Sequence, residues 1–103
     1  MLLVREIMYC KPGKVRPLVE KFVAMSKISE RAGTGRFKVM TDLSAERYWT
    51  VVAEIEMENL QAFDNMMSGQ GQREQDMKEM EEVMKGYHDL VVEGRREIYK
   101  LEN

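Results

Sequence analysis

Apolar and polar side chains alternate with a period of two along several stretches of the chain, which is the period of a β-strand. We therefore predict strands over residues 2–10, 36–43 and 47–56, and a fourth over residues 87–101 that is most regular after Arg95. Both faces of the first strand carry apolar side chains, so we expect both to be covered. Gly94 lies inside the last strand and predicts a bulge or a close approach of another backbone.

Other stretches follow the longer period of an amphipathic α-helix. The pattern predicts a helix over residues 14–32, with an apolar stripe made of Val15, Leu18, Val19, Phe22 and Met25. It also predicts helices over residues 58–68 and 73–85, with stripes made of Leu60, Phe63 and Met67 and of Met77, Met80 and Met84. Glycine-rich segments at residues 33–35, 69–71 and 86 end or separate these helices.

The order strand, helix, strand, strand, helix, strand predicts an α+β, ferredoxin-like fold with a four-stranded antiparallel sheet and the helices on one face. The length of 103 residues fits a single domain over residues 1–103. The first and last strands are neighbours in this topology, and both contain the sequence Arg-Glu-Ile. We therefore predict a register in which Arg5 faces Glu97 and Glu6 faces Arg96.

The sheet face without helices retains apolar residues on its strands. An uncovered apolar face usually marks an interface. Two such sheets can pack face to face around a twofold axis. We therefore expect the protein to be a homodimer through its sheet faces.

The net charge of −2 argues against nucleic acid as a partner, because nucleic-acid binders need a clustered basic surface. The chain lacks an apolar run of about 18 residues that would span a membrane, and a charge at Arg5 argues against a signal peptide. The single cysteine, Cys10, excludes an internal disulfide and a Cys-pair metal site. We therefore expect a cytoplasmic protein without a bound metal.

His88 is the only histidine and the sharpest catalytic candidate, because an imidazole can act as a base near neutral pH. Asp89 can orient it only if this segment is irregular, since neighbouring strand residues point to opposite faces. The alternative is a His88 that bonds the backbone at the end of a loop.

Charged and aromatic side chains on the predicted strands are candidates for ligand binding. Arg95 and Arg96 could bind an anionic or carbonyl group, or could be neutralised at a solvated rim. An aromatic pocket or an aromatic interface would use Tyr48, Trp49 and Tyr99, together with Tyr9.

Two segments resemble the NIPSNAP family of the dimeric α+β barrel superfamily: the turn Lys11-Pro12-Gly13-Lys14 after the first strand, and the closing run Tyr87-His88-Asp89-Leu90-Val91-Val92-Glu93-Gly94-Arg95-Arg96-Glu97-Ile98-Tyr99. The resemblance implies a homodimer whose sheets enclose a barrel. We expect a small molecule to bind in a pocket of this barrel, either between the sheet and the helices or inside it. The superfamily includes cofactor-independent monooxygenases, isomerases and proteins without known activity. An enzyme and a non-catalytic dimerisation module therefore both stay open.

The resemblance also bears on cofactors. Haem-degrading relatives use an Asn, a Trp and a His, and this chain offers Trp49 and His88 without a matching Asn after the first strand. We therefore expect no haem and no other cofactor.

Overall fold

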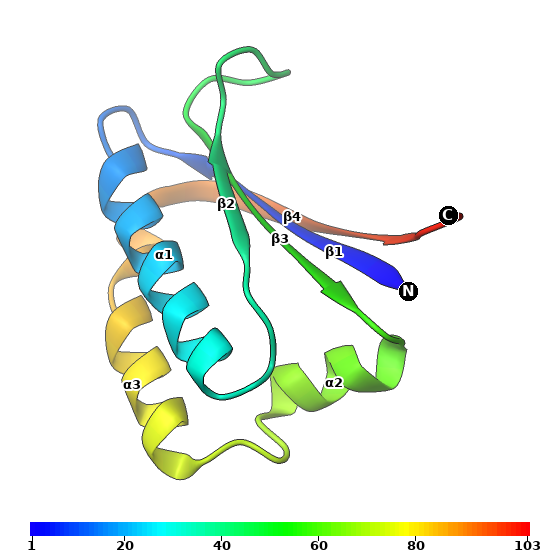
Figure 1. Ribbon diagram of the computed structural model, residues 1–103. Helices are drawn as coiled ribbons and strands as arrows, with labels where there is room; N and C mark the ends of the chain where they lie inside the picture. The colour runs from blue at the N-terminus through cyan, green and yellow to red at the C-terminus, as the bar shows by residue number, and fades with distance from the viewer.

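The computed structural model describes residues 1–103 and has the predicted order of elements. The elements are β1 (Leu2–Cys10), α1 (Val15–Arg31), β2 (Lys38–Thr41), β3 (Thr50–Met57), α2 (Leu60–Ser68), α3 (Glu74–Met84), a 3₁₀ turn η1 (Tyr87–Asp89) and β4 (Val91–Lys100). The strands form one antiparallel sheet in the order β2-β3-β1-β4. The helices lie on one side of it (Figure 1). The ferredoxin-like α+β fold is confirmed.

The predicted register between the first and last strands is also confirmed. Arg5 lies opposite Glu97 and Glu6 lies opposite Arg96. An ion pair joins Arg5 Nη1 to Glu97 Oε1 at 3.5 Å, and Arg96 Nε donates a hydrogen bond to Glu6. Because neighbouring strand residues point to opposite sides, one pair lies on each face of the sheet.

The core lies between the sheet and α1, and α1 buries most of its predicted stripe. The main cluster contains Cys10, Leu18, Val19, Phe22, Val51 and Ala53. The buried face of α1 continues with Ser26, whose hydroxyl accepts a hydrogen bond from Phe37 N at 2.9 Å and donates one to Phe37 O at 3.1 Å. These bonds satisfy a buried hydroxyl and tie the entry of β2 to the helix.

The hairpin between β2 and β3 differs from the prediction. Both strands are shorter, and the residues from 42 to 49 form a loop, so Tyr48 and Trp49 do not lie on a strand. Side-chain hydrogen bonds hold this loop: Thr50 N donates to Asp42 Oδ1 at 2.9 Å, and Thr50 Oγ1 donates to Arg47 O at 2.8 Å. Trp49 has a φ of 61°, a left-handed conformation that a bulky residue rarely adopts.

The stripes predicted for the two later helices are partly wrong. Ala62, Phe63 and Met66 of α2 pack against the second core cluster, whereas Leu60 and Met67 are exposed. The physical reason is that α2 crosses the end of the sheet at β3 and buries only one narrow side (Figure 1).

In α3 the one buried residue is Asp76, and Met77 is exposed. The Asp76 carboxylate accepts hydrogen bonds from Arg31 Nη2 at 2.8 Å and from Arg73 Nε at 3.0 Å. At the other end of α3, Lys21 Nζ donates to Val83 O at 3.0 Å and to Lys85 O at 2.8 Å. Polar contacts at both ends therefore hold α3 against α1.

None of the helices combines the length and the apolar run needed to cross a bilayer.

Candidate functional site

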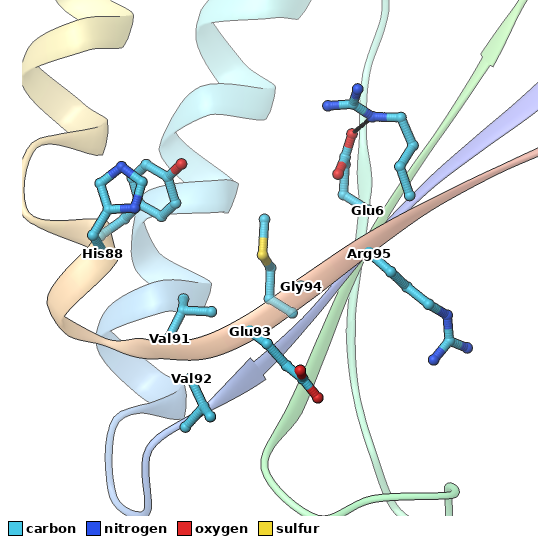
Figure 2. A pocket seen from close by; sticks show the side chains of 10 residues that line it. Glu6, His88, Val91, Val92, Glu93, Gly94 and Arg95 are labelled. Atoms are coloured by element: carbon cyan, nitrogen blue, oxygen red, sulfur yellow. Dashed lines mark hydrogen bonds and ion pairs between the residues drawn. The ribbon is translucent and has the colours of Figure 1, made fainter.

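A cleft with a volume of about 370 Å³ runs along the first half of β4, and we call it the β4 cleft (Figure 2). It is lined by Glu6, Met8, Tyr87, His88, Val91, Val92, Glu93, Gly94, Arg95 and Arg96. Larger hollows of about 890 Å³ beside α1 and β2 and about 690 Å³ under the β2–β3 loop are lined by neither His88 nor Arg96. A hollow of about 630 Å³ at the end of α3 is lined by His88 but by neither Arg95 nor Arg96. The β4 cleft is therefore the hollow in which most of the predicted polar candidates meet.

One wall of the β4 cleft is the turn η1. Gly86 precedes it with a φ of 82°, a left-handed conformation that glycine adopts without strain. Leu90 O accepts a hydrogen bond from Lys11 N at 2.9 Å, which ties the end of this turn to the end of β1. The rings of Tyr87 and His88 stack with their centroids 3.9 Å apart.

His88 is exposed, and no hydrogen bond joins its ring to Asp89 or to a backbone group. The segment is irregular, as an orienting role for Asp89 would require, yet the carboxylate does not contact the ring. The imidazole is therefore free to bond a ligand in the cleft.

The middle of the β4 cleft is formed where β4 approaches β1 at Gly94. A side chain on Gly94 would place its Cβ 2.6 Å from Met8 Sδ and 3.2 Å from Ile7 O. The predicted close approach is therefore confirmed. A register shift lies beside it, because Tyr9 pairs with Glu93 while Cys10 pairs with Val91. The shift leaves Val92 as an extra residue and bends the strand beside η1.

The other end of the cleft carries the Glu6–Arg96 pair. The Arg96 guanidinium also lies over the Phe63 ring, 5.1 Å from its centroid. Both charged side chains are partly exposed. A guanidinium has five N–H donors, and Glu6 engages the Nε donor of Arg96. The remaining donors can bind a carbonyl or hydroxyl oxygen.

The side chains of Arg95 and Arg96 point to opposite faces of the sheet, because they are neighbours on β4. It lines the edge of the cleft, but its guanidinium bonds Glu97 Oε2 at 3.0 Å and the Tyr9 hydroxyl on the opposite face. The Tyr99 hydroxyl donates to Glu97 Oε1 at 3.0 Å. This hydroxyl, followed by Arg95, holds the pKa of Glu97 below its usual value, and Glu97 raises the pKa of Arg95.

The aromatic candidates therefore do not form one pocket. Tyr99 lies on the face opposite the helices, whereas Tyr48 and Trp49 lie in the β2–β3 loop. From the same loop, Arg47 covers the Tyr9 ring at 3.9 Å and bonds Glu93. Hydrogen bonding to Glu93 raises the pKa of Arg47. This second cluster is aromatic and charged, but its charges are paired within the chain.

Several residues of the β4 cleft were not among the sequence candidates: Val91, Val92 and Glu93 of β4, and Glu6, Met8 and Tyr87 from other segments. The repeated Arg-Glu-Ile contained a signal for Glu6, because the register that it predicts places Glu6 beside Arg96. Alternation then places Met8 on the same face. Nothing in the sequence pattern indicates the stacking of Tyr87 on His88.

These features define a ferredoxin-like α+β protein with an open cleft along its last strand. The fold is shared with solved structures described as NIPSNAP-like. A NIPSNAP-like domain protein from Burkholderia xenovorans aligns with a TM-score of 0.73 and 17% identity over 98% of this chain and 85% of that one. A NIPSNAP family protein from Agrobacterium tumefaciens aligns with a TM-score of 0.65 and 14% identity over 97% of this chain and 92% of that one.

A protein from Deinococcus radiodurans, assigned without proof as an antibiotic biosynthesis monooxygenase, also shares the fold. It aligns with a TM-score of 0.71 and 12% identity over 100% of this chain and 94% of that one. No protein-family model matches the sequence, and no curated protein matches it. The resemblance to NIPSNAP proteins seen in the sequence is thus matched by their fold, and at these identities the fold is what the comparison establishes.

Proposed function

We propose that the protein is a NIPSNAP-like homodimer that binds a small organic molecule in the β4 cleft. The binding proposal rests on the gathering of a free imidazole, a Glu–Arg pair and the exposed Gly94 around one hollow. Ligand sites typically combine apolar walls with a few convergent polar groups in a volume of about 300–1,000 Å³. The volume of about 370 Å³ suits a small ligand.

The arrangement of the walls favours a flat molecule with polar substituents. Met8 and Val91 offer apolar contacts to its body, and Tyr87 offers an aromatic ring. Arg96 would donate to a carbonyl or hydroxyl oxygen, while Glu6 would accept from a hydroxyl group. Small quinols and hydroxylated aromatic compounds have this chemistry.

The homodimer is proposed on the open face of the sheet, opposite the helices. Met40 and Tyr99, which alternation places on this face, are exposed. The molecule is also flat, with principal extents of 37 × 35 × 18 Å. A second sheet packed on this side would remove the apolar groups from water.

Replacing Glu6 by Gln or His88 by Ala is expected to weaken binding of a hit from a quinol and aromatic-alcohol panel by about tenfold, since each removes a polar contact. Thermal-shift screening would find the hit, and calorimetry on the wild type and both variants would give the dissociation constants. Glu20→Gln, on the exposed side of α1, is the matched control and should bind as the wild type does. If both cleft variants bind the hit with the same dissociation constant as the wild type, the ligand binds outside the β4 cleft.

Two further functions each have an observation in their favour. The likeness to the Deinococcus protein favours a cofactor-independent monooxygenase or an isomerase of the same fold, with His88 as base. The pairing of Arg95 with Glu97 and of Arg96 with Glu6 favours a non-catalytic dimerisation module, because these charges are already neutralised within the chain.

If a panel compound is converted, His88→Ala is expected to lower its turnover by about 100-fold or more, the usual contribution of a general base. The pH profile of the wild type should then show a rising limb that the variant lacks. Unchanged turnover would remove His88 as the base while leaving the binding proposal intact.

A further inference from the structure

A row of alternating charge crosses the open face of the sheet from one edge to the other. Lys38 of β2 lies opposite Glu54 of β3, Glu54 lies opposite Arg5 of β1, and Arg5 lies opposite Glu97 of β4. The order across the sheet is therefore positive, negative, positive, negative. We call these four residues the charge ladder.

The side on which the charge ladder lies follows from the packing of its neighbours. Val4 and Val39 pack with the core residues beneath the helices. Arg5 follows Val4 directly and Lys38 directly precedes Val39. Both therefore point to the opposite, open face of the sheet. The next row along the strands contains the apolar residues Met40, Val52 and Ile7 and ends at Arg95 on β4. The charge ladder thus lies beside apolar surface on the face proposed for dimer formation.

Contacts within one chain do not saturate the charge ladder. Arg5 Nε lies 2.9 Å from Glu54 Oε2, but this buried nitrogen makes no hydrogen bond of acceptable geometry. Arg5 Nη1 lies 3.5 Å from Glu97 Oε1, which is longer than a typical charged hydrogen bond. Lys38 is exposed and forms no ion pair. The charge of Lys38 and the outer N–H donors of Arg5 are therefore left for a group outside the chain, whereas Glu97 also bonds Arg95 and Tyr99.

We propose that the charge ladder sets the register of the homodimer by pairing with the ladder of a second copy. This inference rests on the proposed dimer. The second copy packs with its twofold axis parallel to the strands and above the gap between β3 and β1. That axis reverses the strand order, so Lys38 faces Glu97 of the partner subunit and Arg5 faces Glu54 of the partner subunit. All four positions of each ladder then meet an opposite charge.

Other twofold arrangements of the two sheets lose this complementarity. A twofold axis in the plane of the interface that runs along the charge ladder, perpendicular to the strands, would place every ladder residue opposite the same residue of the partner subunit. Like charges would then meet at all four positions. An axis above β1 would place Arg5 opposite its own copy and Glu54 opposite Glu97 of the partner subunit. Like charges in contact are costly at an interface and select against a wrong register. The alternating order therefore admits one register with every position paired.

Lys38→Glu tests the charge ladder at an exposed position that has no ion pair to lose. Because it also places a second carboxylate opposite Glu54 of the same chain, thermal melts would record its separate effect on folding. Each dimer contains two Lys38–Glu97 contacts between chains, and the substitution turns both into repulsions. We expect the dimer dissociation constant, measured by sedimentation at low salt, to rise about tenfold or more. At high salt, where charge repulsion is screened, the dissociation constants of the variant and the wild type should lie closer together.

Adding Glu97→Lys to Lys38→Glu should restore the dissociation constant to within a few-fold of the wild type. Lys38 and Glu97 lie on the two opposite edge strands of one sheet, with β3 and β1 between them. A rescue therefore cannot arise from contact within a chain and requires the partner. Glu97→Lys also removes the bonds of Glu97 to Arg95 and Tyr99, so thermal melts would record its separate effect on folding.

Lys100→Glu is the matched control, because it makes the same change on β4 but on the helix side, opposite Leu2. It should leave the dissociation constant unchanged. A dimer that Lys38→Glu does not weaken, or a double variant that associates no better than Lys38→Glu, would overturn the register and leave the dimer standing. A wild-type protein that sediments as a monomer would overturn the dimer and the register together.

Discussion

Leu18→Ala is expected to lower the free energy of unfolding by about 3 kcal/mol, within the range of about 2–5 kcal/mol for removing a large aliphatic side chain from a core. Leu18 is 0% exposed and lies in the cluster that joins α1 to β1 and β3. Its replacement leaves a cavity that these rigid elements fill incompletely. Because a small domain has a total stability of about 5–15 kcal/mol, this is a large fraction.

Chemical denaturation monitored by circular dichroism would measure the change. Val23→Ala on the same helix is the control, because Val23 is 38% exposed and its removal leaves little cavity. The control should cost less than about 1 kcal/mol. Equal effects of the two substitutions would mean that α1 is not anchored through Leu18.

Asp76→Asn is expected to lower the melting temperature by roughly 5 °C or more, because in a domain of this size even a modest loss of stability shifts the melting temperature by several degrees. Asp76 is 1% exposed and is the one buried residue of α3. Its carboxylate bonds Arg31 and Arg73 and also lies in the first turn of the helix, where a negative charge is favourable. An amide offers one acceptor and no charge, so the contact between α3 and α1 loosens. Asp64→Asn, on the exposed side of α2, is the control and should melt as the wild type does.

The stabilisation by Asp76 has a defined pH dependence. Hydrogen bonds from Arg31 and then Arg73 hold its pKa below the usual value for an aspartate. A group whose pKa is lower in the folded state stabilises the fold fully above its unfolded pKa of about 4. That stabilisation is lost as the pH falls through the lower, folded value. The difference between the wild type and Asp76→Asn should therefore be constant near neutral pH and shrink in acid. A difference that grows below pH of about 4 would contradict this assignment.

Loss of Asp76 should also make the wall of the β4 cleft formed by η1 less rigid. The turn with Tyr87 and His88 follows α3 after Gly86. A helix that is less firmly held by α1 holds this wall less firmly. Hydrogen exchange in Asp76→Asn should therefore rise both in α3 and at residues 87–90, while β1 keeps its protection.

Patterns that involve neighbours in sequence determined much of this protein. The period of two located the strands, and the period of the helix located α1 and its stripe. The repeated Arg-Glu-Ile determined the register of β1 and β4, because a one-residue slip would move every charge to the wrong face. Gly94 indicated the close approach of two backbones. The strands and α1 follow from local geometry. The register and the close approach join segments far apart in the chain, but a repeated motif and a glycine mark them in the sequence.

Tertiary structure decided what depends on groups far apart in the chain. Arg31 makes Asp76 the buried residue of α3, against a methionine stripe that periodicity alone favoured. Hydrogen bonds from Thr50 to Asp42 and Arg47 hold the loop before β3, so that β3 begins only at Thr50 and Trp49 lies in the loop. The β4 cleft brings His88 of η1 to the same hollow as the Glu6–Arg96 pair of β1 and β4. Contacts over such separations form only when the sheet and helices have packed, so no local pattern records them.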